Sequence, residues 1–164
     1  MKQLKRTVAG LLMTAAAPAC ATGLVQVKLL SLDMARTIGE AAVEACRKDG
    51  YQVSVAVTDR SGEPLLVMRD IYSNRYFTQL ALGKANAVIM ANTTSAELRQ
   101  NRSDMVSELH LLDGVMVLAG GVPVQVAGSL VGAVGVSGAP GGDLDESCAR
   151  AGVDAVQDEL DCAD

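Results

Sequence analysis

The sequence predicts an α+β fold in which an antiparallel sheet of about five strands is flanked by helices. Short β-prone segments occur at residues 53–58, 65–69, 122–127 and 130–136. The turn between the first two segments and the turn between the last two are too short for a crossover helix, which indicates two antiparallel hairpins. Segments with helical spacing lie at both ends of the domain and in its middle. The predicted order is α-β-β-α-α-β-β-β-α, a two- or three-layer sandwich whose terminal helices cover one face of the sheet.

The first predicted helix covers residues 32–48. Its apolar residues keep helical spacing, Ser31 can cap its N-terminus, and Gly50 ends it. The next segment, residues 53–58, alternates valine with smaller residues and is typical of a strand. Residues 65–69 return as its hairpin partner.

The centre of the chain is predicted to be mainly helical. Residues 74–90 form a second helix, and residues 94–112 form two short helices separated around residues 101–103. Residues 115–118 are predicted as a short buried strand, and residues 143–160 as the last helix.

A glycine-rich stretch, residues 120–152, is the most informative part of the chain. Gly128-Ser129 predicts a two-residue hairpin turn, because glycine adopts positive φ without a steric cost. Gly132 and Gly135 interrupt the second strand of this hairpin, which indicates close approach by a helix or a ligand. Acidic residues then open the last helix, where they offset its positive end.

The N-terminus has the pattern of a secretory signal peptide. Three basic residues precede a short apolar run, residues 8–17, and small residues around Ala21 suit a cleavage site. The run is too short to span a bilayer, which takes about 20 residues, so we expect no transmembrane segment. We expect residues 1–21 to be removed and residues 22–164 to form a single periplasmic or secreted domain. That domain carries 11 basic and 19 acidic residues, a net charge of −8.

This composition excludes nucleic acid as a partner. The acidic charge disfavours phosphate backbones, and the four aromatic residues provide no stacking platform for single strands.

The cysteines predict one disulfide. Signal cleavage removes one of four cysteines and leaves Cys46, Cys148 and Cys162, so one thiol stays free or forms an intermolecular link. Cys148 and Cys162 lie about 21 Å apart along one predicted helix and cannot bond to each other. Antiparallel packing of the first and last helices would pair Cys46 with Cys148, whereas parallel packing would pair Cys46 with Cys162. We favour the first.

The glycine-rich stretch carries the pattern GG-x-P-V, followed by G-x-x-x-GA-x-GVSGAPGG-x-x-DE-x-CA-x-AG. This pattern closely resembles that of the GlcG/HbpS family of haem-binding proteins, whose domain also forms the C-terminal part of PduO-type corrinoid adenosyltransferases. Further matches are VSVAVTDRSGEPL at residues 53–65, Arg69-Asp70 and Lys84-Ala85. The resemblance spans roughly residues 30–156. It implies an α+β domain, a haem ligand and a homo-oligomer.

The resemblance also suggests site residues. Secreted members often carry a histidine seven residues after the arginine that corresponds to Arg69, and this position holds Tyr76, with Lys84 at the matching later position. A phenolate oxygen is an accepted axial haem ligand, so Tyr76 is the candidate iron ligand. Its alternative role is to pack the helix onto the sheet. Arg69 and Lys84, expected to face each other, would pair with propionates or with a small carboxylate substrate.

The alternative is that Arg69 and Lys84 bind no ligand and that each forms a surface ion pair with Asp59, Asp70 or Asp113.

The single histidine, His110, excludes a histidine-based triad and a multi-histidine metal site. It is kept as a haem-contact candidate, with a structural role at a helix C-terminus as the alternative. Asp145-Glu146 could act as an acid/base pair, but their place at a helix N-terminus explains them without catalysis. Ser137 does not fit a nucleophile elbow.

Three functions are consistent with these features. The first is an exported haem- or tetrapyrrole-binding protein that acts in sequestration or sensing and not in turnover. The second is an accessory protein or small enzyme for a carboxylate metabolite such as a 2-hydroxy acid. The third is an oligomerisation module without a ligand.

Overall fold

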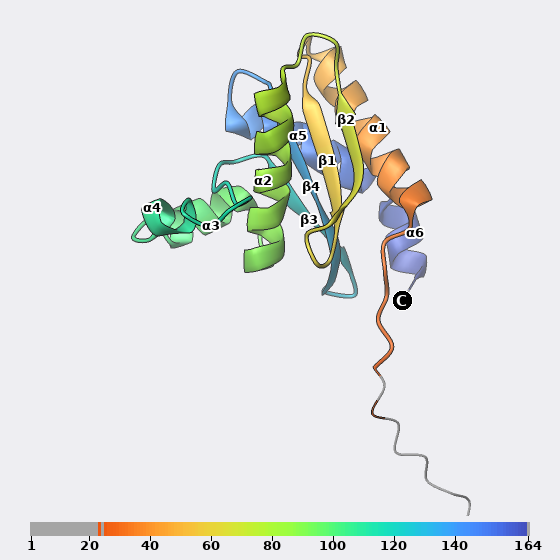
Figure 1. Cartoon of the computed structure of the whole chain (residues 1–164). Coiled ribbons are helices and arrows are strands. Elements are labelled where there is room, and N and C mark those ends of the chain that lie inside the picture. Colours follow the sequence, from red (N-terminus) through yellow and green to blue (C-terminus); the bar gives the residue numbers. More distant parts are fainter. Residues whose placement is uncertain (1–22, 24, 164) are drawn as a thin grey trace, which may run out of the picture.

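The structure is a computed structural model that describes residue 23 and residues 25–163 (Figure 1). The predicted signal peptide lies outside these residues. The elements follow the order α1 (Leu32–Lys48), β1 (Ser54–Asp59), β2 (Pro64–Arg69), α2 (Arg75–Ala91), α3 (Ser95–Asn101), α4 (Val106–Leu109), β3 (Gly121–Val126), β4 (Ser129–Ser137), α5 (Gly142–Asp154) and α6 (Gln157–Cys162).

The four strands form one antiparallel sheet in the order β2-β1-β4-β3. Val55 in β1 lies opposite Met68 of β2 on one side and Val136 of β4 on the other. β3 pairs with β4 through the predicted hairpin, with Val122 opposite Val134. The central strands β1 and β4 are nearly all buried, as expected for strands covered on both faces.

Helices cover both faces of the sheet (Figure 1). α1 and α5 pack against each other and against one face, where the larger hydrophobic core lies. α2 crosses the other face over β4, β1 and β3, and α3 and α4 extend from that side. The prediction that the terminal helices share a face is confirmed.

Gly135 explains how closely α2 approaches the sheet. A Cβ atom built on Gly135 would collide with the backbone carbonyl oxygen of Ala81 in α2. The interruption of β4 by this glycine therefore marks close contact with a helix, which is one of the two explanations that the sequence left open.

The expected fifth strand is absent from the described chain. Val117 is buried as predicted, but residues 115–118 pair with no strand. The backbone N–H of Met116 instead donates to the carbonyl of Gly83 in α2, at 2.9 Å. This segment hydrogen-bonds to a helix and not to a strand, so its β-prone composition does not produce a strand.

Two boundaries also differ from the prediction. The β3–β4 turn is formed by Ala127 and Gly128, with φ of 48° and 76°, and not by Gly128-Ser129. Positive φ at both central residues is typical of a type I′ turn, which suits the twist of a hairpin. The last predicted helix is divided into α5 and α6 at Ala155 and Val156.

A disulfide joins Cys46 of α1 to Cys148 of α5, with the two Cα atoms 5.5 Å apart. The two helices run antiparallel, since Gly152 of α5 lies against Ile38, two turns before Cys46. The preferred pairing is confirmed, and Cys162 is an exposed free thiol.

Candidate ligand-binding groove

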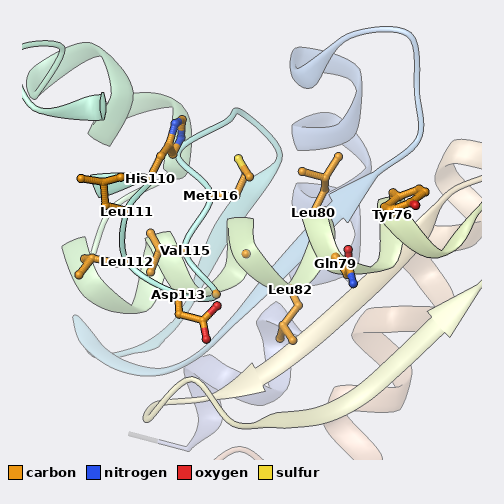
Figure 2. A pocket seen from close by; sticks show the side chains of 12 residues that line it. Tyr76, Gln79, Leu80, Leu82, His110, Leu111, Leu112, Asp113, Val115 and Met116 are labelled. Carbon is orange, nitrogen blue, oxygen red and sulfur yellow. The ribbon is translucent and has the colours of Figure 1, made fainter. Parts of the chain in front are cut away.

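A cavity of about 670 Å³ lies between α2 and the segment that follows α4 (Figure 2). Small-molecule sites typically measure about 300–1,000 Å³ and are mostly apolar with a few polar groups. We call this cavity the groove and residues 110–116 its wall segment. α2 contributes Tyr76, Gln79, Leu80, Leu82 and Gly83, and the wall segment contributes His110, Leu111, Leu112, Asp113, Gly114, Val115 and Met116.

Tyr76 stands in the first turn of α2 at one end of the groove (Figure 2). Asn74 caps this helix by accepting the N–H of Tyr76 at 2.9 Å, which fixes the start of the helix. The Tyr76 side chain is 58% exposed. Arg75 lies 4.8 Å from the ring centroid and donates a hydrogen bond of 3.2 Å to the phenolic oxygen. This positive charge complements the anionic oxygen that iron ligation would require.

The wall segment is attached directly to α2. The Met116 N–H bonds to the carbonyl of Gly83, and Asn86 Nδ2 donates to the carbonyl of Gly114 at 3.0 Å. A Cβ on Gly83 would lie 2.7 Å from Met116 Cβ, so the close approach of helix and wall segment requires glycine here. The floor of the groove is thus formed where these two elements meet.

His110 lines the groove on the side opposite Tyr76 (Figure 2). Its Nε2 accepts the backbone N–H of Val117 at 3.0 Å. Val117 is completely buried, so binding iron through Nε2 would leave this N–H without its acceptor. An unsatisfied buried donor costs about 1–3 kcal/mol, which disfavours His110 as the iron ligand.

Lys84 does not line the groove and points towards β4 and α5. Its ammonium donates to Asp145 Oδ2 at 2.7 Å and to the carbonyl of Val136 at 2.9 Å. The side chains of Lys84 and Asp145 are only 3% and 5% exposed. Lys84 is therefore held in a buried ion pair, and the structure does not bring it to face Arg69.

Arg69 is exposed at the end of β2 and donates to the carbonyl of Ser73, just before α2 begins. Among the described residues, neither Arg69 nor Lys84 forms an ion pair with Asp59, Asp70 or Asp113, the aspartates considered as their surface partners. Asp70 pairs with Arg47, and Lys84 pairs with Asp145.

Asp145 also accepts the backbone N–H of Ala139 at 3.0 Å. Burial raises the pKa of Asp145, and the hydrogen bond and charge of Lys84 partly offset this rise. Glu146 pairs separately with Arg150, one turn later on α5. The two acidic neighbours thus serve different ion pairs, in agreement with a structural role.

Arg75, Gln79 and Asp113 lie at the groove but were not predicted as site residues from the sequence. Gln79, Leu80 and Gly83 follow Tyr76 by three, four and seven residues, so helical spacing from Tyr76 would have placed them on one face. No comparable signal exists for the wall segment, which is irregular.

The described residues contain no group of three or more histidine, cysteine and acidic side chains that could hold a metal ion. Nor does any helix within them have the length and apolarity needed to cross a membrane.

Comparison with known proteins assigns the family. A family model described as "Haem degrading protein HbpS-like" matches residues 30–154. The chain belongs to the HbpS-like family. GlcG of Escherichia coli K12 is 30% identical to this HbpS-like chain over 109 residues, which cover 66% of the chain and 81% of GlcG.

Solved structures agree with this assignment. A double mutant of HbpS from Streptomyces reticuli is 40% identical, with a TM-score of 0.75 over 87% of this HbpS-like chain and 99% of that one. A crystal structure of PduOC in complex with haem is 26% identical, with a TM-score of 0.69 over 78% of this chain and 95% of that one.

Proposed function

We propose that this protein binds haem, or a closely related tetrapyrrole, in the groove between α2 and the wall segment. The observation that carries the proposal is an open apolar groove of about 670 Å³ with a tyrosine oxygen at its rim. Leucine, valine and methionine side chains suit the faces of a porphyrin, and a phenolate suits ferric iron. Membership of the HbpS-like family and the haem complex of PduOC support the choice of ligand.

Tyr76 is the proposed iron ligand. Tyr76 is more than half exposed, and Arg75 supplies the adjacent positive charge. His110 is less suitable because its Nε2 already accepts the Val117 N–H.

The charges around the groove suggest how the ligand is oriented. Arg69 and Arg75 lie near the N-terminal end of α2, whereas Asp113 lies in the wall segment. Haem propionates would be attracted to the arginine end and repelled by Asp113. We propose Arg69 and Arg75 as the propionate partners, because Lys84 is committed to Asp145.

Replacing Tyr76 with phenylalanine tests the ligand. Titration of the purified wild-type protein with hemin should produce a saturable shift of the Soret band, together with a charge-transfer band typical of phenolate ligation. Tyr76→Phe keeps the aromatic ring but removes the phenolic oxygen, which is the proposed iron ligand. We expect it to abolish the charge-transfer band and to weaken hemin affinity by at least about tenfold, which corresponds to about 1.4 kcal/mol.

Tyr72→Phe is the matched control, because Tyr72 is 84% exposed and does not line the groove. It should leave both spectrum and affinity unchanged. A Tyr76→Phe spectrum identical to that of the wild type would show that another group binds the iron. If the wild type itself produced no Soret shift, the role in carboxylate metabolism would become the better account.

We further propose that the protein works outside the cytoplasm, as a single domain of residues 22–164 that sequesters or senses its ligand. The basic and apolar pattern of residues 1–21 supports export, and the Cys46–Cys148 disulfide is typical of oxidising compartments. Intact-mass measurement of protein recovered from the periplasm should give a chain that begins near Ala21 or Thr22. A periplasmic product that retained residues 2–12 would contradict this processing.

We also propose that the protein self-associates. Val67, Ile71 and Tyr72 are exposed on the edge strand β2 and in the connection that follows it, and a symmetric interface would cover such a surface. Light scattering at micromolar concentration should give a mass well above 17.0 kDa, the mass of the full 164-residue chain before processing. A monomer that persists at high concentration would rule the interface out.

A further inference from the structure

The wall segment has no regular secondary structure, so its position depends on the packing of Val115 against the cluster around Val117 and on a few hydrogen bonds. At its C-terminal end the Met116 N–H and the Asn86 side chain join it to α2. At its N-terminal end the His110 side chain reaches forward seven residues to the N–H of Val117. This last bond closes the segment into a loop whose two ends are held together.

The hydrogen bond of His110 is made to a buried part of the chain. The Val117 side chain is fully buried in a cluster with Ala87 of α2 and Leu98 of α3, so its backbone is held against the rest of the fold. By accepting the Val117 N–H, Nε2 connects the C-terminal end of α4 to this fixed point. A ring that accepts through Nε2 is neutral and carries its proton on Nδ1.

We infer that His110 is a positioning residue of the haem site, which sets the placement of the wall segment against α2 and does not bind the iron. The inference rests on the proposed function, since it concerns the same groove. His110 acts through Leu111, Leu112 and Met116, which supply much of the apolar surface of the groove. Without the Nε2 acceptor, the wall segment loses its closure and the groove loses a defined width.

Three substitutions of His110 separate positioning from ligation. In His110→Gln, the side-chain oxygen lies as many bonds from Cβ as Nε2 does and can accept the same N–H. In His110→Asn, the oxygen is one bond too short, and His110→Ala removes the acceptor entirely. Because His110 is exposed at the end of a short helix, we expect all three variants to fold.

The first measurement is amide hydrogen exchange without ligand, followed by NMR. Loss of the acceptor should make the Val117 amide exchange at least about tenfold faster in the Ala and Asn variants, and Gln should restore the wild-type rate. Unchanged exchange of Val117 in His110→Ala would overturn the inference, whether or not hemin binds.

The second measurement is hemin titration of the same proteins. We expect a dissociation constant about tenfold higher for Ala and Asn, near the wild-type value for Gln, and one spectral shape at saturation for all four proteins. A hemin affinity in His110→Ala equal to that of the wild type would overturn the positioning role. A changed ligation spectrum in Ala and Gln alike would show that His110 binds the iron. If the wild type did not bind hemin, the proposed function would fail. The role of His110 in placing the wall segment is tested separately by hydrogen exchange. Wild-type exchange rates at residues 114–116 in His110→Ala would overturn it.

Discussion

Lys84→Met should lower the free energy of unfolding by about 3–5 kcal/mol, because it leaves the buried carboxylate of Asp145 without its cation. Methionine has nearly the length of lysine and fills the same space, so the loss reports on charge and not on packing. In the variant, Asp145 keeps its backbone hydrogen bonds from Ala139 and Gly138 but has no cation beside it. Equilibrium urea unfolding followed by circular dichroism measures the change.

Arg150→Met is the matched control on α5, the helix that carries Asp145. Its partner Glu146 is one turn away, and Arg150 is largely exposed, so this pair should contribute no more than about 0.5 kcal/mol. The double variant Lys84→Met/Asp145→Asn should recover part of the loss, since a neutral amide is cheaper to bury than a charge. A Lys84→Met loss no larger than that of Arg150→Met would refute the role of the buried pair.

The defect of Lys84→Met should also depend on pH. Burial already raises the pKa of Asp145 above its ordinary value, and removing Lys84 takes away the charge that offsets this rise. Because the pKa of this carboxyl group is higher in the folded protein, its contribution to stability is fully present at pH values below its unfolded pKa of about 3.9. This contribution disappears as the pH rises through the folded pKa. The difference in stability between variant and wild type should therefore shrink as the solution is acidified towards pH 4.

Removal of the Cys46–Cys148 disulfide should cost about 2–5 kcal/mol. The bond joins residues 102 apart in the sequence, and a closed loop of about 100 residues lies near the upper end of the chain-entropy estimate. It also holds α1 against α5 over the larger core. The variant Cys46→Ala/Cys148→Ala, unfolded in urea, should show a lower midpoint, and reduction of the wild type should shift its midpoint in the same direction.

Cys162→Ser is the control for this experiment. Cys162 is exposed and forms no disulfide in the structure, so its replacement should leave the urea midpoint unchanged. A midpoint for the Cys46/Cys148 double variant equal to that of the wild type would show that the bond adds nothing to stability. Reaction of the Cys46 thiol with an alkylating reagent in the folded, unreduced protein would show that the Cys46–Cys148 disulfide does not form.

Local signals explain which elements the sequence could predict. The first helix was predicted at its observed limits because its cap is local, with Ser31 accepting the N–H of Met34 at 3.1 Å. The hairpins were also predictable, since each needs only two adjacent segments and a turn. Helix geometry reduced the three possible cysteine pairs to two, because it excluded a bond between Cys148 and Cys162.

The shifted β3–β4 turn and the divided last helix are local differences, whereas the larger errors depend on packing between elements. Lys84 finds its partner 61 residues later on α5, a contact that no spacing rule in α2 could indicate. The segment around Met116 has strand-like composition but lies against Gly83 of a helix, so it becomes the wall of the groove. The hydrogen bond of His110 to Val117 is likewise set by the fold of an irregular segment.

Paramagnetic NMR tests the central claim, that haem binds in the groove between α2 and the wall segment, most directly. The bound iron(III) of hemin broadens the amide signals of nearby residues, while gallium protoporphyrin, which lacks unpaired electrons, serves as the reference. We expect selective broadening at residues 76–83 and 110–116, with little change in α1 and α5 on the opposite face of the sheet (Figure 1). Broadening centred on α1 and α5, or no residue-specific broadening at saturating hemin, would contradict the account.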